Sequence, residues 1–574
     1  MRMRFLLTAV LCILAAGAAA RAEDSIPPAD MSEEEALQLG ESMYRDGILP
    51  SGEPMQAIVM GDIPVDGRMF TCDDCHQRSG LGSVEGTVIT WPTNGRELYK
   101  PRRSTGAWHP PETEAQRQDV RKKELPEYWK QIEPVRPAYT DESLARALRT
   151  GIDPAGRKLD PIMPLYLLDD RDMGILVHYL KNLSVDLAPG VDETTIRFAT
   201  VVADDVPAED RRTMLATLQA HIDVHNSQSR HQERRAASGP FFKTQMHQAY
   251  RRMQLDIWEL TGPAETWPAQ LQEYYEKQPV FALLGGMASG SWRPVHEFCE
   301  QHKIPAIFPL TDFPVVSESD WYTLYYSKGF YQEGETAARY LHRIENIEPD
   351  AGIVIVSRDD LQGKALRQGF AETWKTSGRQ EPEHLLMGPE EKATEEFWRN
   401  LMQTKQPKVL ILWLGTGDLG KIENLALGNR LPDMVILSSE LLEYTFGGIP
   451  DELRDSVYLT YPYSLPGTEE RGELAVKNWL QARNIPLADL TMQAKIYFFG
   501  WMLPGAVKYM RSEFFREYFL EGFDMMIDQD YAIPVYPRLT FGNGQRYASK
   551  GCYIVQLTKG SDPELVQKSD WVIH

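Results

Sequence analysis

The chain has 574 residues, of which 42% are hydrophobic and 25% are charged, a composition typical of a folded globular protein. That balance excludes a wholly disordered or fibrous chain, and the length predicts several folding units. Acidic residues outnumber basic residues 82 to 61, and the resulting formal charge of −21 argues against nucleic acid as a partner. Five cysteines are too few for a scaffold built on disulfides.

Residues 1–22 have the pattern of a cleaved signal peptide. Two arginines precede an apolar run from Phe5 to Ala16, and small residues lead to an Ala-x-Ala-like cleavage site at Ala22. The apolar run is shorter than the ~20 residues that a membrane-spanning helix needs, and no later segment is long and apolar enough to span. We therefore expect a mature chain without a membrane span, exported to a bacterial periplasm.

Cys72, Cys75 and His76 form a C-x-x-C-H pentapeptide, the pattern of covalent attachment of c-type haem. Two thiols at this spacing can bond to the two vinyl groups of one haem, and the adjacent histidine can then bind the iron. A redox dithiol and half of a zinc site are the alternatives. The chain has no second Cys-x-x-Cys, and the glycine-rich flank is unlike a thioredoxin-type motif. The motif predicts one covalent haem c per chain.

A methionine downstream is the candidate for the second axial ligand of the iron. Met163 lies between Pro161 and Pro164, just before an amphipathic helical pattern over 173–183. A methionine thioether opposite a histidine raises the haem potential and leaves no open coordination position. Three other residues are rival ligands: Met69, His109 and His178.

Residues 30–185 resemble class I cytochromes c. The matching pieces are a helical pattern over 33–44, the C-x-x-C-H motif, the loop GIDPAGRKLDPIMP and a closing helix that ends YLKNL. The resemblance implies an all-α domain with thioether bonds at Cys72 and Cys75, His76 as the proximal ligand and Met163 as the distal ligand. A polar insertion near residues 100–135 departs from the family pattern.

The distribution of apolar residues along the sequence changes after a polar linker at 186–194. From residue 195 to 574, short apolar runs alternate with helical patterns, first over 196–309 and again over 352–438. Alternation of strands and helices at this period predicts a doubly wound parallel sheet, and two such sets predict two lobes.

The region 195–574 resembles the type I periplasmic substrate-binding proteins, such as those for branched-chain amino acids. The most informative stretch is LLGGMASGSWRPVHEFCEQHKIPAIFPLTDFP, in which two strands each end in a turn. Such open sheets bind ligands beyond the carboxyl ends of their strands. The resemblance implies a site for a small polar organic ligand formed by Ser289, Ser291, Leu310, Asp312 and Glu440.

In that resemblance Glu440 would hold an ammonium group of the ligand. Asp312 stands where the family has a neutral hydroxyl, so it adds negative charge and favours a ligand with a positive charge or several hydroxyls. The alternatives are structural: Ser289 and Ser291 can cap the helix that follows them, and Glu440 can be a solvated acid at a helix start.

The leading interpretation is a periplasmic mono-haem electron carrier fused to a ligand-binding module that recruits or senses a metabolite. Its redox partner would be another periplasmic protein, such as a quinoprotein dehydrogenase or a terminal oxidase chain. One alternative is the solute-binding component of an ABC-type transport system with an accessory cytochrome; another is the haem subunit of a dehydrogenase system. Direct catalysis is not expected. Met163 would fill the open coordination position that a haem enzyme needs, and no G-x-G-x-x-G turn for a second cofactor follows a strand.

Overall fold

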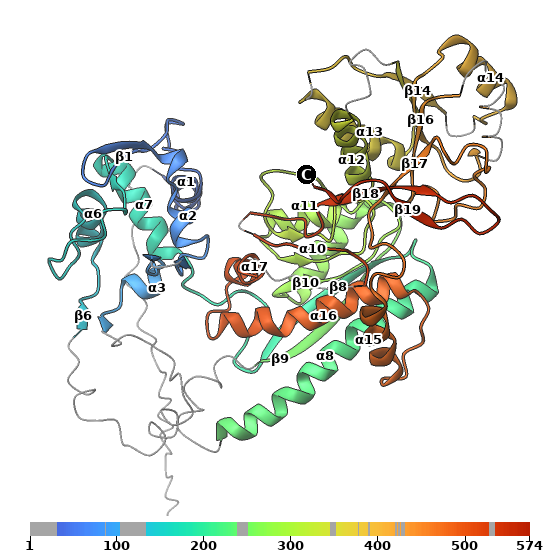
Figure 1. Ribbon diagram of the computed structural model, residues 1–574. Helices are drawn as coiled ribbons and strands as arrows, with labels where there is room; N and C mark the ends of the chain where they lie inside the picture. The colour runs from blue at the N-terminus through green and yellow to red at the C-terminus, as the bar shows by residue number, and fades with distance from the viewer. Residues whose placement is uncertain are drawn as a thin grey trace, which may run out of the picture. The chain divides into compact units, whose positions relative to one another are not determined.

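The structure is a computed structural model that describes residues 31–573 apart from 86–87, 104–133, 238–250, 345–351, 377, 389–390, 420–421, 423–424, 426–430, 527–533 and 543. The expected signal peptide and His109 lie outside the described residues. The chain divides into two compact units, one up to Asp186 and one from Leu187 (Figure 1).

Among the described residues of the first unit, five helices surround the core: α1 (Glu33–Arg45), α2 (Cys72–His76), α3 (Gly95–Leu98), α6 (Asp141–Thr150) and α7 (Asp170–Asn182). Side chains cap their starts, since Ser32 accepts from the Glu35 amide in α1 and Asp169 accepts from the Asp172 amide in α7. The helices α1 and α7 approach closely at Gly40, where a Cβ would lie 2.4 Å from Cβ of Tyr179.

The first unit also contains strands, so the all-α fold expected for it is not what the structure shows. The strands β1 (Gln56–Val59), β2 (Ile63–Asp66) and β7 (Leu165–Tyr166) form an antiparallel sheet in the order β2-β1-β7. Two strand pairs are shorter still: β3 (Val84–Glu85) with β4 (Val88–Ile89), and β5 (Arg102–Arg103) with β6 (Pro134–Arg136). Strands of two to four residues are too short to leave an alternating pattern in the sequence.

The second unit begins with a parallel sheet in the strand order β12-β11-β10-β8-β9. Its strands are β8 (Thr195–Ala203), β9 (Arg252–Leu260), β10 (Ala282–Leu284), β11 (Ala306–Ile307) and β12 (Thr323–Leu324). The helices α8 (Ala208–Ala237), α10 (Trp267–Lys277) and α11 (Arg293–Gln301) connect them. The expected alternation of strands and helices is present, and the central strand β10 is fully buried, as a parallel sheet covered by helices requires.

A second sheet follows in the order β14-β13-β15-β16-β17-β18-β19. The strands β13 (Ile353–Arg358), β14 (Glu383–Met387), β15 (Val409–Trp413), β16 (Met434–Ser438) and β17 (Val457–Tyr461) are parallel. The late strands β18 (Gly551–Leu557), β19 (Leu565–Gln567) and β20 (Val572–Ile573) add antiparallel pairs. The helices of this lobe include α12 (Phe330–Arg343), α13 (Leu361–Lys375) and α14 (Glu395–Thr404). The predicted two-lobed α/β architecture is therefore observed.

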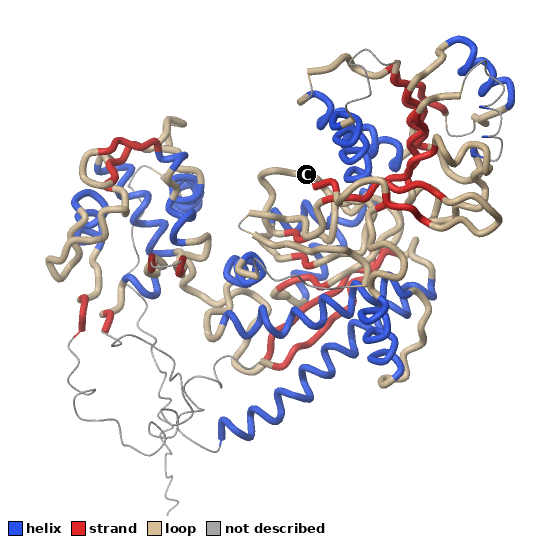
Figure 2. The backbone as a smooth tube through the Cα atoms, viewed as in Figure 1, coloured by secondary structure: helices blue, strands red, loops and turns tan. Residues whose placement is uncertain are grey.

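The chain returns to the first lobe before it ends. After β17, the helices α15 (Glu470–Gln481), α16 (Leu490–Met510) and α17 (Arg516–Asp524) contribute side chains to the core around β8, and β18 then joins the second sheet (Figure 2). Arg516 fixes this return, because its guanidinium donates to the carbonyls of Phe281 at 3.0 Å and Val280 at 2.7 Å. The two lobes are thus joined by three crossings of the chain.

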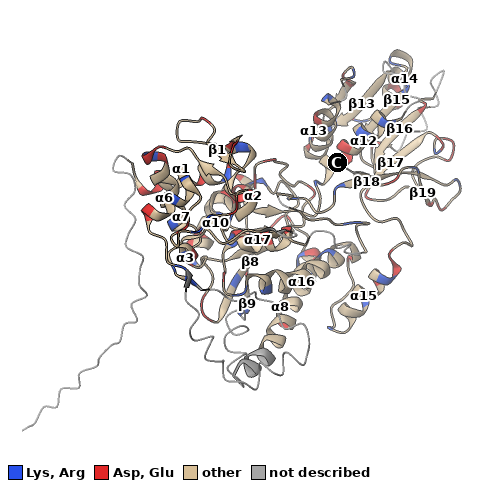
Figure 3. Ribbon diagram, turned by 60° about the vertical axis from the view of Figure 1, so that its left-hand side comes forward, with Lys and Arg blue, Asp and Glu red and all other residues tan. Residues whose placement is uncertain are grey.

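Figure 3 marks both acidic and basic residues along the ribbon of several helices, α15 among them. One example is the Lys477 ammonium, which lies 2.9 Å from the Glu473 carboxylate one turn earlier on α15. Such pairs are typical of solvated helix faces. Among the described residues, no helix combines the length and the apolar character needed to cross a membrane.

Candidate functional site

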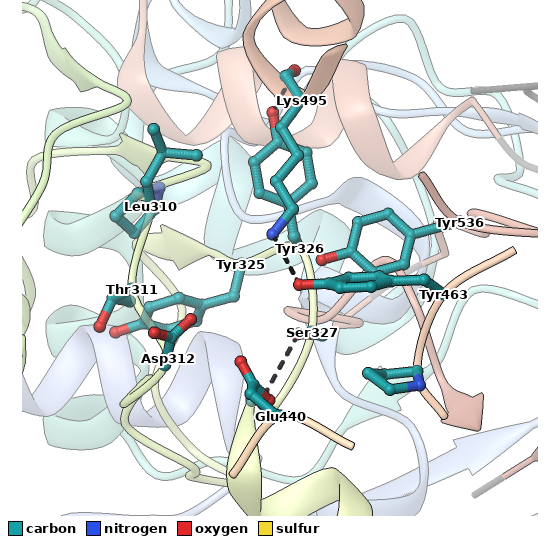
Figure 4. Close-up of a pocket in the computed structure, with 13 residues that line it drawn as sticks. Leu310, Thr311, Asp312, Tyr325, Tyr326, Ser327, Glu440, Tyr463, Lys495 and Tyr536 are labelled. Carbon is teal, nitrogen blue, oxygen red and sulfur yellow. Dashed lines mark hydrogen bonds between the residues drawn. The ribbon is translucent and has the colours of Figure 1, made fainter. Parts of the chain in front are cut away.

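A pocket in the second unit lies where strand ends of the two sheets meet (Figure 4). Its walls come from residues 309–312 after β11, residues 325–327 after β12, Glu440 after β16 and residues 462–463 after β17. Lys495 of α16 and Tyr536 complete the lining. Nearly all of these residues follow the carboxyl end of a parallel strand, which is where open α/β sheets place their ligands.

Two carboxyl groups from different lobes face each other in this pocket. Asp312 belongs to the segment after β11, and Glu440 belongs to the turn after β16 (Figure 4). Burial raises the pKa of Glu440 well above its ordinary value, and the charges of Asp312 and Glu333 and a hydrogen bond with the Asp312 carboxyl raise it further. A hydrogen bond between two carboxyl groups requires that one of them is protonated. Burial and the facing Asp312 carboxyl therefore favour the protonated form of Glu440.

Lys495 brings a positive charge to the same pocket. Its ammonium donates to the Tyr463 hydroxyl at 3.3 Å and lies 5.5 Å from the ring centroid of Tyr536 (Figure 4). Burial acts to lower the pKa of Lys495, but the two tyrosines and the carboxyls of Asp312 and Glu440 outweigh it, so the pKa is raised. The side chain is therefore a fixed cation and not a neutral amine.

A third carboxyl group lies behind the pocket. Glu333 of α12 is fully buried and accepts from the Glu440 amide at 3.3 Å and from the Thr460 hydroxyl. Burial raises the pKa of Glu333 to about 7, although hydrogen bonds from Thr460 and Ser438 oppose the shift. These contacts attach the turn that contains Glu440 to α12, the helix with which the chain enters the second lobe.

The structure brings three of the five predicted ligand residues together, since Leu310, Asp312 and Glu440 all line the pocket. The two serines lie elsewhere. The Ser289 hydroxyl donates to the Asp205 carbonyl at 3.0 Å, and the Ser291 hydroxyl accepts from the Arg293 amide at 3.3 Å, at the start of α11. Their contacts match the structural alternative, in which the serines stabilise the turn and the helix start.

Sequence reasoning missed Lys495 and the tyrosines around it. Lys495 lies on α16, which the expected strand–helix alternation did not include, and a lysine within the apolar run of that helix was the available indication. Tyr463 and Tyr536 each follow or precede a proline in irregular segments. Nothing in their spacing shows that they meet the ends of β11 and β16.

In the first unit, α2 places the haem motif on a single helical turn. Cys72 is buried and contacts the Tyr166 hydroxyl at 3.4 Å, whereas Cys75 is exposed. The His76 ring is buried, which lowers its pKa to about 4, and its Nδ1 lies 2.9 Å from the Trp91 carbonyl. A carbonyl only accepts, so Nδ1 carries the hydrogen and Nε2 keeps the lone pair that an iron ion would bind.

The loop with Met163 lies close to this turn in the fold. Tyr166, which contacts Cys72, follows Met163 by three residues, and the Pro161 carbonyl accepts from the Met60 amide at 2.9 Å. Met163 is half-buried and packs against the core of the unit. Of its rivals, Met69 is 74% exposed and His178 is buried within α7.

The other two cysteines of the described residues are both buried thiols, and Cys12 lies outside those residues. Cys299 lies on α11 in the core of the first lobe, and Cys552 lies on β18 in the second sheet. Burial raises the pKa of both thiols well above the ordinary value. They are packed core residues and not reactive nucleophiles.

No protein-family model and no curated protein matches the chain. Solved structures do match it. An ABC transporter substrate-binding protein from Sphaerobacter thermophilus has 14% identity and a TM-score of 0.47, over 66% of this chain and 98% of its own. A branched-chain amino acid ABC transporter protein from Thermus thermophilus with bound valine has 10% identity and a TM-score of 0.46, over 66% and 97%. A fatty acid ABC transporter substrate-binding protein from Thermomonospora curvata has 14% identity and a TM-score of 0.42, over 68% and 95%.

The sequence identities of these matches are too low to assign the ligand of any of these proteins to this chain. The fold is defined by the strands and helices of this structure itself. The proteins named are nevertheless substrate-binding components of transporters and not cytochromes. On this finding the prediction that the chain functions as an electron-transfer cytochrome is wrong.

Proposed function

We propose that the chain binds a small polar solute in the periplasm as the solute-binding component of an ABC-type transport system. The observation that carries this proposal is the pocket itself, in which Asp312 from one lobe faces Glu440 from the other and Lys495 lies beside them. A ligand that contacts both lobes would stabilise the arrangement in which the lobes meet. The solved structures that match the chain are described as proteins of the same role.

A thermal-shift screen of the full chain with periplasmic metabolites tests this proposal. A solute at a hundredfold excess over its Kd stabilises the folded protein by about 2.7 kcal/mol, which raises the Tm visibly. The matched variant is Thr311→Trp, which places a large ring in the pocket lining, with Thr468→Trp on the exposed surface as its control. A solute that raises the Tm of the wild type and the control but not of Thr311→Trp supports the pocket; no shift with any solute contradicts the proposal.

We also propose that the first unit carries one covalent haem c, bonded to Cys72 and Cys75, with His76 and Met163 as the axial ligands. The support is chemical: α2 presents two thiols and a neutral imidazole on one turn, and His76 directs Nδ1 to the Trp91 carbonyl and so leaves Nε2 for iron. The haem would supply an iron centre with both axial positions filled. Apolar side chains of this unit that are exposed in the structure offer surface for it to cover, among them Ile63, Phe70, Ile89 and Trp91.

Acid–acetone extraction of the protein from its native host tests the covalent attachment. Thioether bonds survive unfolding, so the haem should remain with the denatured chain. The variant Cys72→Ala/Cys75→Ala should lose it, whereas Cys299→Ala, a buried cysteine of the second unit, should keep it. Haem that can be extracted from the wild type would contradict the assignment.

A further inference from the structure

The ligand pocket contains an aromatic cage that is already filled. The Lys495 ammonium lies 5.1 Å from the ring centroid of Tyr463, 5.5 Å from that of Tyr536 and 6.0 Å from that of Tyr326. Cages of aromatic rings at such distances attract cations, and proteins use them to bind ammonium groups of ligands. Here the chain's own lysine occupies the position that a ligand's ammonium would take.

The Lys495 ammonium also supplies positive charge beside the carboxyl groups of the pocket. It belongs to the same lining as Asp312 and Glu440, and burial raises the pKa of Glu440 and so favours its neutral form. The next carboxyl group, Glu333, is fully buried behind Glu440 and is satisfied by Thr460 and the Glu440 amide. A cationic ligand would therefore find the aromatic cage occupied by the Lys495 ammonium, which would repel it.

The hydrogen-bonding groups that remain are those that recognise hydroxyls. The Lys495 ammonium donates one of its three N–H groups to the Tyr463 hydroxyl at 3.3 Å, and a ligand hydroxyl can accept from another. The hydroxyls of Thr311 and Ser327 also line the pocket. They accept from the Phe313 amide at 3.1 Å and the Gly329 amide at 3.2 Å, and the Thr311 hydroxyl can still donate to a ligand. A ligand hydroxyl has the same dual capacity.

We propose that Lys495 determines the ligand class of this pocket, so that it selects an uncharged solute with several hydroxyl groups and rejects small amines. This inference rests on the proposed solute-binding function and narrows it. It decides between the two ligand types that the sequence left open, the positively charged ligand and the hydroxylated one. Lys495 acts as a specificity-determining residue, because its ammonium excludes one class of ligand and donates to the other.

Three probes with one carbon skeleton test the inference: 1,2-propanediol is neutral, 1-amino-2-propanol is a cation and lactate is an anion at neutral pH. Isothermal titration calorimetry of each probe into the full chain measures the three affinities. The wild type should bind the diol at least about tenfold more tightly than the amine, the ratio expected when a charge is left without a partner. An amine that binds as tightly as the diol, or no measurable binding of the diol, overturns the inference.

Variants of Lys495 separate its charge from its bulk. Lys495→Met keeps most of the length but removes the cation, so binding of the amine should increase about tenfold relative to the diol. Lys495→Arg keeps the positive charge and should keep the wild-type preference. If Lys495→Met does not fold, as judged by its circular dichroism, Lys495→Gln takes its place, and the order of affinities in the wild type remains a test that needs no variant.

The outcomes distinguish this inference from the function on which it rests. If the metabolite screen finds a cationic solute that binds the wild-type pocket, the inference is wrong and the solute-binding function stands. If no solute raises the Tm and no probe binds the wild type or either variant, both are wrong. An amine that gains affinity in Lys495→Met but not in Lys495→Arg supports the role of the charge.

Discussion

At the scale of single residues, the carboxyl pair makes the stability of the second unit depend on pH. Glu440 faces Asp312 across the pocket, Glu333 lies behind it, and Lys495 provides the compensating charge. Other titratable groups near Glu440 are Tyr444, Tyr463, Tyr536 and Cys552, and burial raises the pKa of each. A carboxyl group with a raised pKa holds its proton in the folded state at pH values where the unfolded chain has lost it.

The sign of the effect follows from this difference. Above the unfolded pKa of glutamate, about 4.3, the folded state binds more protons than the unfolded state, so stability falls as pH rises toward the folded pKa of Glu440. Glu440→Gln has no carboxyl group at this position, so it should not show this fall in stability as pH rises. The Tm of the variant relative to the wild type should therefore increase from pH 5 to pH 8, in thermal unfolding followed by circular dichroism. Glu443→Gln, an exposed neighbour, should show no such trend, and a trend of equal size in both variants would contradict the assignment.

The axial ligand of the proposed haem is a second question at this scale. Met163→Ala removes the thioether that would fill the sixth position, so carbon monoxide should bind the ferrous protein and the reduction potential should fall. Met69→Ala is the matched control, because Met69 is 74% exposed. Visible absorption spectra with and without carbon monoxide measure the effect. Unchanged spectra in Met163→Ala would show that another residue is the ligand.

Some of the pocket residues were predictable from the sequence and others were not. Leu310, Asp312 and Glu440 line the pocket because each follows a buried strand that the apolar runs reveal. Ser289 also follows a strand, but Asp205 binds its amide and hydroxyl and holds the turn away from the pocket lining. The contact that decides this lies 84 residues away in sequence, so local pattern does not contain it.

At the scale of elements, α8 and α16 pack so closely that one position requires glycine. A Cβ at Gly500 of α16 would lie 2.1 Å from Cγ of His221 on α8, and the His221 ring is itself stacked on Trp479 with centroids 4.2 Å apart. Gly500→Ala would overpack this contact and should lower the free energy of unfolding by about 1–3 kcal/mol. Chemical denaturation of the full chain, with the transition of the second unit followed, measures the change.

The same helix offers a control for that prediction. Gly505 is exposed, and the nearest atom to a Cβ there is Cε of Met526 at 3.9 Å, an ordinary contact. Gly505→Ala should therefore stabilise the protein by up to about 1 kcal/mol, because alanine favours the helix. If both substitutions stabilise, the helices do not pack as closely as the structure indicates.

Elements with strong local determinants were predictable. The sequence pattern places a helix after Thr140 and ends it at Gly151, and the structure has α6 with a Thr140 capping box and Gly151 in the left-handed region at φ 67°. The sheet β2-β1-β7 was not predictable. Its register joins Ala57 to Tyr166, and such a long-range pairing of short strands leaves no periodic pattern.

At the scale of the whole molecule, the two lobes of the second unit follow from the repeated alternation of strands and helices. The return of the chain to the first lobe does not follow from this alternation. The helices α15 to α17 come after the second set of strands in sequence but pack with the first sheet, and β18 then pairs with β17. This return brings Lys495 to the pocket, so the residue that sets the charge of the site depends on topology and not on a motif.

Native mass spectrometry of the full chain, purified from the periplasm of its own host, tests most directly whether the pocket binds a solute. The wild type should carry a small molecule that is released on gentle activation and absent from Thr311→Trp, whose added ring fills the pocket. Thr468→Trp should retain the molecule as the wild type does. A wild type without any small molecule that also gives no thermal shift in the metabolite screen, or the same molecule retained equally by Thr311→Trp, would contradict solute binding between the two lobes.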